Sequence, residues 1–238
     1  MGIDAWRLRA SSVDAQVVSA QAVNARPCAV PVSSASLGNT APDIATNTDW
    51  DVLQQHVADC TRCDLHRTRT QTVFGVGNRT ADWLVIGEAP GAEEDKRGEP
   101  FVGRAGQLLD NMLAAIGLDR ARNVYIANIL KCRPPNNRDP QAHEVACCEP
   151  YLQQQIALIQ PRLILAVGRI AAQNLLKTDV PLARLRGRVH RYGERQTPLI
   201  VTYHPAYLLR TPGDKRKAWE DLQLAVRVYR ELGGGATA

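Results

Sequence analysis

Short apolar runs alternate with amphipathic segments of helical length along most of the chain. The apolar runs are "WLVIGEA" (83–89), "NVYIAN" (123–128), "RLILAVG" (162–168) and "PLIVTYHP" (198–205). The segments with helical spacing of apolar residues lie at 105–118, 140–160, 169–177 and 214–233, and Pro150 is expected to restart or kink the second of them. This alternation predicts an α/β fold with a mostly parallel sheet covered by helices on both faces.

The ordered domain is expected to begin close to residue 49. Trp50, Leu53 and Val57 recur at helical spacing, whereas residues 10–48 are rich in Ala, Ser, Val, Asn and Thr and show no sustained period. We therefore expect a disordered or loosely ordered N-terminal arm at 1–48 and a folded domain at 49–238. A chain of 238 residues has room for one sizeable α/β domain and such an appendage.

The charge is distributed unevenly. The formal net charge is +5, and the segment 184–217 contains nine Lys or Arg residues but only two acidic residues. A surplus of this kind suits a polyanionic partner, although a solvated basic surface is the alternative. No apolar run approaches the ~20 residues that span a bilayer, and the N-terminus lacks an apolar signal region. We expect a cytoplasmic protein without membrane contact.

Functional groups should gather where the predicted strands end. In open parallel sheets, ligands bind outside the carboxyl ends of the strands. Those ends read "GEAPG" at 87–91, "AN" at 127–128, "GR" at 168–169 and "YHP" at 203–205. Glycines permit close approach of a ligand to the backbone, and main-chain N–H groups can bind a carbonyl or a phosphate. This edge of the sheet is the predicted site.

The six cysteines call for a metal or redox explanation, because disulfides are rare in cytosolic proteins. Cys60 and Cys63 form a C-x-x-C pair that follows a helix, unlike a thioredoxin-type motif. No second C-x-x-C pair marks a zinc ribbon. Cys132 and either Cys147 or Cys148 are the remaining candidates. Spacing alone leaves a [4Fe–4S] cluster, a zinc site and inert buried cysteines open.

Several motifs in order resemble those of one family. The chain carries C-x-x-C, "GEAPGAEED", "GEPFVGRAGQLLD", "NILKCRPPNNRDP", a later cysteine, "LRGRVH" and "HPAYLLR". Together they resemble family-4, iron–sulfur uracil-DNA glycosylases, from about Cys60 to the last helix. The resemblance implies a three-layer α/β/α sandwich around a short, mostly parallel sheet. It also implies hydrolysis of the uracil N-glycosidic bond in DNA, and a structural [4Fe–4S] cluster on Cys60, Cys63, Cys132 and Cys148.

Excision of a base requires that the nucleotide leave the stack and enter a pocket. Phe101 is the candidate surface for stacking, because a base on an aromatic ring gains about 1–3 kcal/mol. The Asn128 amide can donate to uracil O4 and accept from N3–H, whereas cytosine presents the opposite polarity. His204 can donate to uracil O2 as negative charge develops there. Gly87, Glu88 and Ala89 complete the expected uracil-binding set.

Two acidic residues are candidates for supporting roles in catalysis. Related glycosylase families carry an Asp at the position of Ala89 to orient water, and this carboxylate is missing here. Glu88 or Glu94 is therefore expected to position water or to counter positive charge on the sugar, and Glu94 to block a thymine methyl. The candidate DNA contacts are Arg186, Arg188, His190, Tyr207, Leu208, Leu209 and Arg210, with core packing as the alternative for the two leucines.

Two other functions stay open from the sequence. The first is a uracil-DNA binding protein that traps its product covalently. Such relatives carry "GEQPG" where this chain has "GEAPG", and they have a basic, His-containing insert after the Asn strand, where this chain reads "CRPPNNRDP" without a His. A non-enzymatic iron–sulfur accessory of a DNA polymerase is the second alternative. The protein is expected to be a monofunctional, monomeric enzyme, and the N-terminal arm is a candidate surface for a protein partner.

Overall fold

The computed structural model describes residues 50–235 and contains a six-stranded sheet of order β1-β3-β2-β4-β6-β5. The four inner strands are parallel, and both edge strands are antiparallel to their neighbours. The strands are β1 (Val76–Gly77), β2 (Trp83–Gly87), β3 (Val124–Asn128), β4 (Leu163–Val167), β5 (Val189–Tyr192) and β6 (Thr197–Thr202). This mixed sheet is consistent with the predicted α/β class.

The registry of the inner strands brings their carboxyl ends level. Gly87 at the end of β2 pairs with Asn128 at the end of β3, and Val167 of β4 pairs with Thr202 of β6. Every residue of β2, β3 and β4 is buried, so these strands are apolar throughout rather than alternating. The residues that follow these strands, Glu88, Gly168 and His204 among them, therefore share one edge of the sheet.

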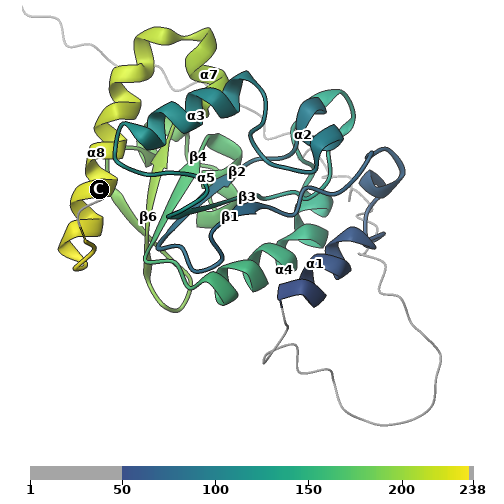
Figure 1. Ribbon diagram of the computed structural model, residues 1–238. Coiled ribbons are helices and arrows are strands. Elements are labelled where there is room, and N and C mark those ends of the chain that lie inside the picture. Colours follow the sequence, from purple (N-terminus) through teal and green to yellow (C-terminus); the bar gives the residue numbers. More distant parts are fainter. Residues whose placement is uncertain (1–49, 236–238) are drawn as a thin grey trace, which may run out of the picture.

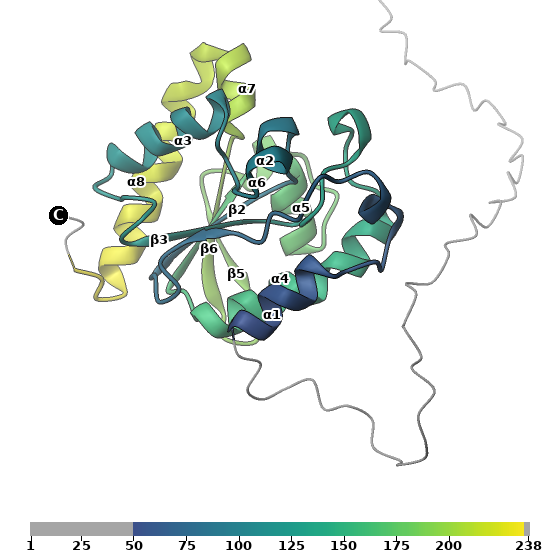
Figure 2. The same ribbon diagram turned by 45° about the vertical axis from the view of Figure 1, so that its right-hand side comes forward.

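Helices cover both faces of the sheet. The α-helices are α1 (Trp50–Ala58), α2 (Ala92–Arg97), α3 (Arg104–Ala114), α4 (Ala142–Ile159), α5 (Arg169–Leu176), α6 (Leu182–Leu185), α7 (Pro205–Arg210) and α8 (Lys215–Glu231). Three 3₁₀ turns, at Asp64–Arg67, Pro135–Asn137 and Pro212–Asp214, lie in the connections. Figures 1 and 2 show α1 and α4 together on one side of the sheet, with α3 and α8 on the other.

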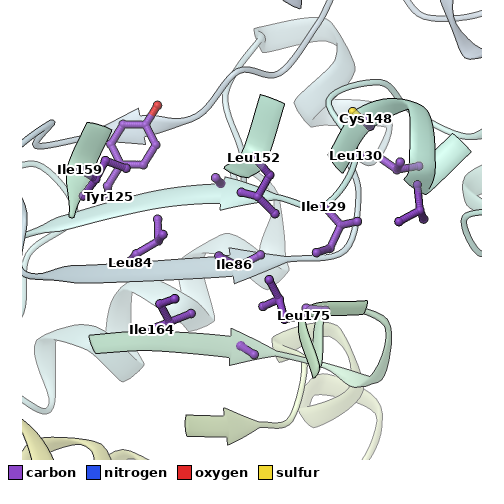
Figure 3. Packing of buried hydrophobic residues seen from close by; sticks show 14 of the residues in the cluster. Leu84, Ile86, Tyr125, Ile129, Leu130, Cys148, Leu152, Ile159, Ile164 and Leu175 are labelled. Carbon is purple, nitrogen blue, oxygen red and sulfur yellow. The ribbon is translucent and has the colours of Figure 1, made fainter. Parts of the chain in front are cut away.

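Two apolar layers follow from this arrangement. On the α1/α4/α5 side, Leu84, Ile86 and Ile164 of the sheet belong to one buried cluster with Leu152 and Leu175 of the helices (Figure 3). On the α3/α8 side, a second buried cluster joins alternate residues of the same strands to the apolar stripe of α8. Because consecutive strand residues point to opposite faces, both layers require apolar side chains in the same strands.

The four predicted strands and five predicted helices are present, with ends shifted by a few residues. Pro150 lies inside the continuous helix α4. The short strand β1, the edge strand β5 and the short helices α2, α6 and α7 were not predicted as such. The N-terminal arm at 1–48 and Cys28 lie outside the described residues. Within 50–235, no helix is long and apolar enough to cross a membrane.

Candidate functional site

A cleft of about 810 Å³ opens at the carboxyl ends of the inner strands. Its lining comes from the end of every inner strand and from the loop 134–138. The residues predicted to bind uracil or to act in catalysis line it, apart from Gly87: Glu88, Ala89, Glu94, Phe101, Asn128 and His204. The structure thus brings together side chains that are up to 116 positions apart in the sequence.

Asn128 is a buried polar side chain at the floor of this cleft. Its exposed fraction is 2%. Within the described part of the chain, its Oδ1 is buried and has no hydrogen-bond partner. A buried polar oxygen of this kind costs about 1–3 kcal/mol unless it is satisfied, so such groups are kept where a ligand satisfies them. Asn128 is therefore arranged to accept a hydrogen bond from a molecule in the cleft.

Gly87 allows the two principal side chains to meet. A Cβ at this position would lie 2.4 Å from Oδ1 of Asn128 and 2.6 Å from Cζ of Phe101. Both side chains therefore lie over bare backbone at the end of β2, and any larger residue would displace them. The sequence predicted that this glycine would let a ligand approach the backbone; the structure shows it making room for these two side chains.

The ring of Phe101 stacks on the ring of His204. The two centroids are 5.5 Å apart and the planes differ by 29°. A base inserted between two rings needs about 7 Å, twice a van der Waals separation of about 3.5 Å. A base in this cleft must therefore lie against the part of Phe101 that faces the cavity, with the imidazole at its edge.

The backbone of Phe101 is held in the left-handed region, with φ of 55°. The Glu94 carboxylate accepts hydrogen bonds from the N–H groups of Val102 (3.0 Å) and Gly103 (3.3 Å). Arg120 donates to the carbonyl of Phe101 (2.8 Å) and to that of Pro100 (3.2 Å). These contacts from both sides fix a strained residue, a feature that clusters at functional sites.

His204 is positioned as a neutral donor. It caps α7, where its Nδ1 accepts a hydrogen bond from the N–H of Ala206 (3.1 Å). Since Nδ1 uses its lone pair, the proton of the neutral ring is on Nε2. Burial lowers the pKa of His204 to about 4, and the Arg210 cation acts in the same direction, against Glu94. Between pH 4 and 6.5 the unfolded chain binds more protons here, so this residue contributes stability that is lost as pH falls.

Glu88 has the opposite pH behaviour. Burial raises its pKa to about 7, Asp139 raises it further, and Arg169 opposes both. Asp139 and Arg169 form an ion pair with a separation of 2.6 Å between Oδ2 and Nη2. Between pH 4.5 and 7 the folded protein binds more protons at Glu88 than the unfolded chain does. The stability that Glu88 contributes at low pH is therefore lost as pH rises. Near neutral pH, Glu88 can either donate or accept a hydrogen bond.

The four free cysteines of the described residues surround a second, small cavity. Cys60, Cys63, Cys132 and Cys148 line it, and Cys147 lines it as well. Within 50–235, no group of three or more His, Cys, Asp or Glu side chains converges on a point that suits a single metal ion. A four-iron cluster does not require such a point, because each iron takes its own thiolate.

Cationic and N–H donors face the sulfurs of this cavity. Nη1 of Arg69 donates to Sγ of Cys132 (3.0 Å), and the main-chain N–H of Lys131 donates to Sγ of Cys148 (3.2 Å). Donors of this kind stabilise thiolates and are one of the means by which a protein tunes a cluster. The donor set therefore fits an iron–sulfur cluster held by these four residues.

The candidate DNA contacts divide into exposed and internal side chains. Arg188, Leu209 and Arg210 are exposed. Leu208 has an exposed fraction of 1% and packs in the interior, which agrees with core packing, the alternative to a DNA contact. Tyr207 donates from its hydroxyl to Oδ2 of Asp214 (2.6 Å) and stacks on Tyr203.

Arg186 and His190 are held by the protein itself. Nε of Arg186 donates to Oδ2 of the buried Asp221 (2.7 Å), and its guanidinium lies 4.3 Å from the ring centre of Tyr203. His190 lies on the edge strand β5 and its Nε2 is 2.7 Å from the carbonyl oxygen of Leu185. These contacts favour a structural contribution from both residues, whereas Arg188 and Arg210 remain open to DNA.

Comparison with known proteins decides the family. The model of the uracil DNA glycosylase superfamily matches residues 74–223. A type-4 uracil-DNA glycosylase of Archaeoglobus fulgidus is 48% identical over 169 residues, covering 68% of this chain and 84% of that protein. The chain belongs to this superfamily. A type-4 enzyme of Pyrobaculum aerophilum is 41% identical over 74% of this chain and 92% of its own length, and one of Thermotoga maritima is 40% identical over 77% and 96%.

Sequence reasoning missed the residues that support the glycosylase-like cleft. Arg120 follows Phe101 by 19 positions and carries no motif that would reveal its contact with the Phe101 carbonyl. Gly168, with φ of 98°, permits the approach of His204, since a Cβ there would lie 3.0 Å from that of His204. The only available signal was that Gly168 ends a predicted strand, where a close approach was expected.

Proposed function

We propose that this protein removes uracil from DNA by hydrolysing its N-glycosidic bond and leaves an abasic site. The single observation that carries the assignment is Oδ1 of Asn128, which is buried in the cleft at the strand ends and has no hydrogen-bond partner among residues 50–235. The relatives named as type-4 uracil-DNA glycosylases support the same activity over most of this chain.

Recognition rests on polarity. In the proposed complex, uracil lies against Phe101, its N3–H donates to Oδ1 of Asn128, and its O4 accepts from Nδ2. Cytosine would place an amino group and an unprotonated ring nitrogen at these two atoms, leaving both sides of each contact without a partner. A site that depends on such hydrogen bonds rejects the wrong base strongly.

Cleavage rests on stabilisation of the leaving group. As the bond between C1′ and N1 breaks, its electron pair moves to uracil and negative charge develops on O2. The neutral His204 is proposed to donate from Nε2 to this oxygen, which a preorganised group can do without reorganisation. Water then attacks the positively charged sugar at C1′, Glu88 is proposed to hold this water, and the proton that the water loses neutralises the departing uracil anion. The dissociative course of the reaction makes only a small demand on the nucleophile, in keeping with Ala89 where other families have an Asp.

Glu94 is proposed to act through the loop that it holds. Its carboxylate anchors the N–H groups of Val102 and Gly103 and so fixes Phe101 against the cleft. This contact supports a positioning role in addition to its predicted function against a thymine methyl.

A [4Fe–4S] cluster is proposed to be held by Cys60, Cys63, Cys132 and Cys148. The cluster would cross-link the segment after α1, the loop after β3 and the helix α4, and in this way stabilise the fold. The support is the shared cavity of four free thiols and the donors that face Cys132 and Cys148.

DNA is proposed to cross the mouth of the cleft, with Arg188 and Arg210 near phosphates and Leu209 filling the space left by the flipped base. All three are exposed, and Leu209 follows the cleft residue His204 on the short helix α7. Phosphate contacts of this kind give affinity that falls with salt and carries no base preference.

The test uses an oligonucleotide with one uracil and a matched oligonucleotide with thymine. The protein is incubated with each, and the products are treated with alkali. A strand break only at uracil is the expected result. A denaturant-resistant adduct would instead indicate covalent trapping. An intact strand without an adduct would favour the polymerase-accessory alternative.

A further inference from the structure

The side chain of Lys131 places an ammonium group in the protein interior. Its exposed fraction is 1%, and it stands between the end of β3 and the cysteine Cys132. A buried charge is costly unless hydrogen bonds and countercharge compensate for it. Since the side chain is buried, it does not reach DNA phosphates, and its role has to lie in what it contacts inside the protein.

The ammonium group of Lys131 bonds back to the main chain of Asn128, the residue proposed to recognise uracil. Nζ of Lys131 donates to the main-chain oxygen of Asn128 (3.0 Å) and to Oε1 of Gln155 on α4 (2.6 Å). Gln155 in turn donates from Nε2 to the carbonyl of Phe74 (2.9 Å). The carbonyl of Asn128 is thus tied through one side chain to α4 and to the segment before β1.

The main chain of the same residue contacts the cysteine cavity. The N–H of Lys131 donates to Sγ of Cys148 (3.2 Å), and its carbonyl accepts from the N–H of Val73 (2.8 Å). Figure 3 shows Cys148 beside Leu130, beyond the carboxyl ends of the strands. Lys131 therefore contacts Cys148 through its main-chain N–H and Asn128 through Nζ.

We propose that Lys131 is a positioning residue that couples the cysteine cavity to the uracil-reading amide of Asn128. This inference rests on the proposed function of Asn128. Lysine suits the task because its three N–H donors satisfy two acceptors at once and its four-carbon stem fills the space between them. A cluster bound by Cys148 would fix one end of this link, and the orientation of Asn128 the other.

The experiment compares Lys131→Met with wild-type protein. Methionine has a similar length and donates no hydrogen bond, so the Asn128 carbonyl loses its restraint while the volume is nearly kept. Three quantities are measured: iron content, the dissociation constant of free uracil, and kcat/KM on uracil-containing DNA normalised to iron content. We expect iron to be retained, uracil affinity to fall about tenfold, and kcat/KM to fall about 10- to 100-fold, as expected for a reacting group misplaced by a fraction of an ångström.

Two further variants separate positioning from loss of structure. Gln155→Leu removes the acceptor that holds the ammonium group, so it should lower uracil affinity in the same direction even where Lys131→Met does not fold. Gln153→Leu is the matched control: Gln153 is exposed on the same helix α4 and donates to Oε1 of Glu149 (3.2 Å). It should leave iron content and uracil affinity unchanged.

The outcomes are distinct. Unchanged uracil affinity in Lys131→Met or in Gln155→Leu would overturn the coupling, as would an equal loss in Gln153→Leu, which would show a general effect of changes in α4. A wild-type protein that neither binds uracil nor cuts uracil-containing DNA would instead refute the proposed function.

Discussion

Replacement of Asn128 by alanine should separate function from stability. The side chain is 2% exposed, and within the described residues its Oδ1 has no partner. Removing a buried unsatisfied oxygen relieves about 1–3 kcal/mol, which offsets the packing lost with the amide. We therefore expect the free energy of unfolding of Asn128→Ala to lie within about 1 kcal/mol of the wild-type value.

The effect of Asn128→Ala on catalysis should be large. Two base atoms, O4 and N3–H, would lose their partners in a closed site, at about 1–3 kcal/mol each. The sum of about 2–6 kcal/mol corresponds to a fall in kcat/KM of about 30- to 20,000-fold, at about 1.4 kcal/mol per factor of ten.

The assay for Asn128→Ala combines strand cleavage after alkali with chemical unfolding and iron content. Asn78→Ala is the matched control, because Asn78 is a satisfied turn residue: it donates to the Arg122 carbonyl (2.7 Å) and accepts from the N–H of Thr80 (2.9 Å). The control should lose stability and keep activity. A variant Asn128→Ala that keeps wild-type kcat/KM, or that loses activity together with its fold, would refute the reasoning.

Three further predictions follow from the same cleft and from the cysteine cavity. Between pH 4.5 and 6.5, Glu88 makes the free energy of unfolding fall with rising pH and His204 makes it rise, by up to about 3 kcal/mol each. Unfolding curves of Glu88→Gln, which keeps only the His204 effect, should therefore show stability rising with pH, and those of His204→Asn should show it falling. Parallel pH profiles for both variants would contradict this. Arg120→Met should lower kcat/KM about tenfold by releasing the Phe101 carbonyl, and a wild-type steady-state rate would show that this clamp has no part in activity. Cys148→Ser should lose bound iron while Cys147→Ser retains it, and the reverse pattern in an iron assay would overturn the choice of ligand.

The inner sheet could be predicted because burial on both faces forces continuous apolar runs. The edge strand β5 could not, because "VHRY" alternates between exposed and partly buried positions and lies within the Arg-rich stretch 184–195, which is typical of a basic loop. The two-residue strand β1 is too short for any periodic signal. Only the pairing with β3 and β6 makes these segments strands.

The candidate site was predictable where its residues end strands. Glu88, Asn128 and His204 each follow an apolar run, so the sheet brings them to one edge. The partners that hold them were not predictable, because contacts such as Arg120 with Phe101 depend on loop geometry. The same holds for Arg186: a basic run does not reveal which guanidinium is turned inward to the buried Asp221, 35 positions away.

A structure of the protein with bound uracil tests the account most directly. We predict the base against Phe101, with Oδ1 of Asn128 within hydrogen-bond distance of N3 and Nε2 of His204 within hydrogen-bond distance of O2. Uracil bound outside the cleft, or inside it with Asn128 and His204 contacting neither atom, would contradict it.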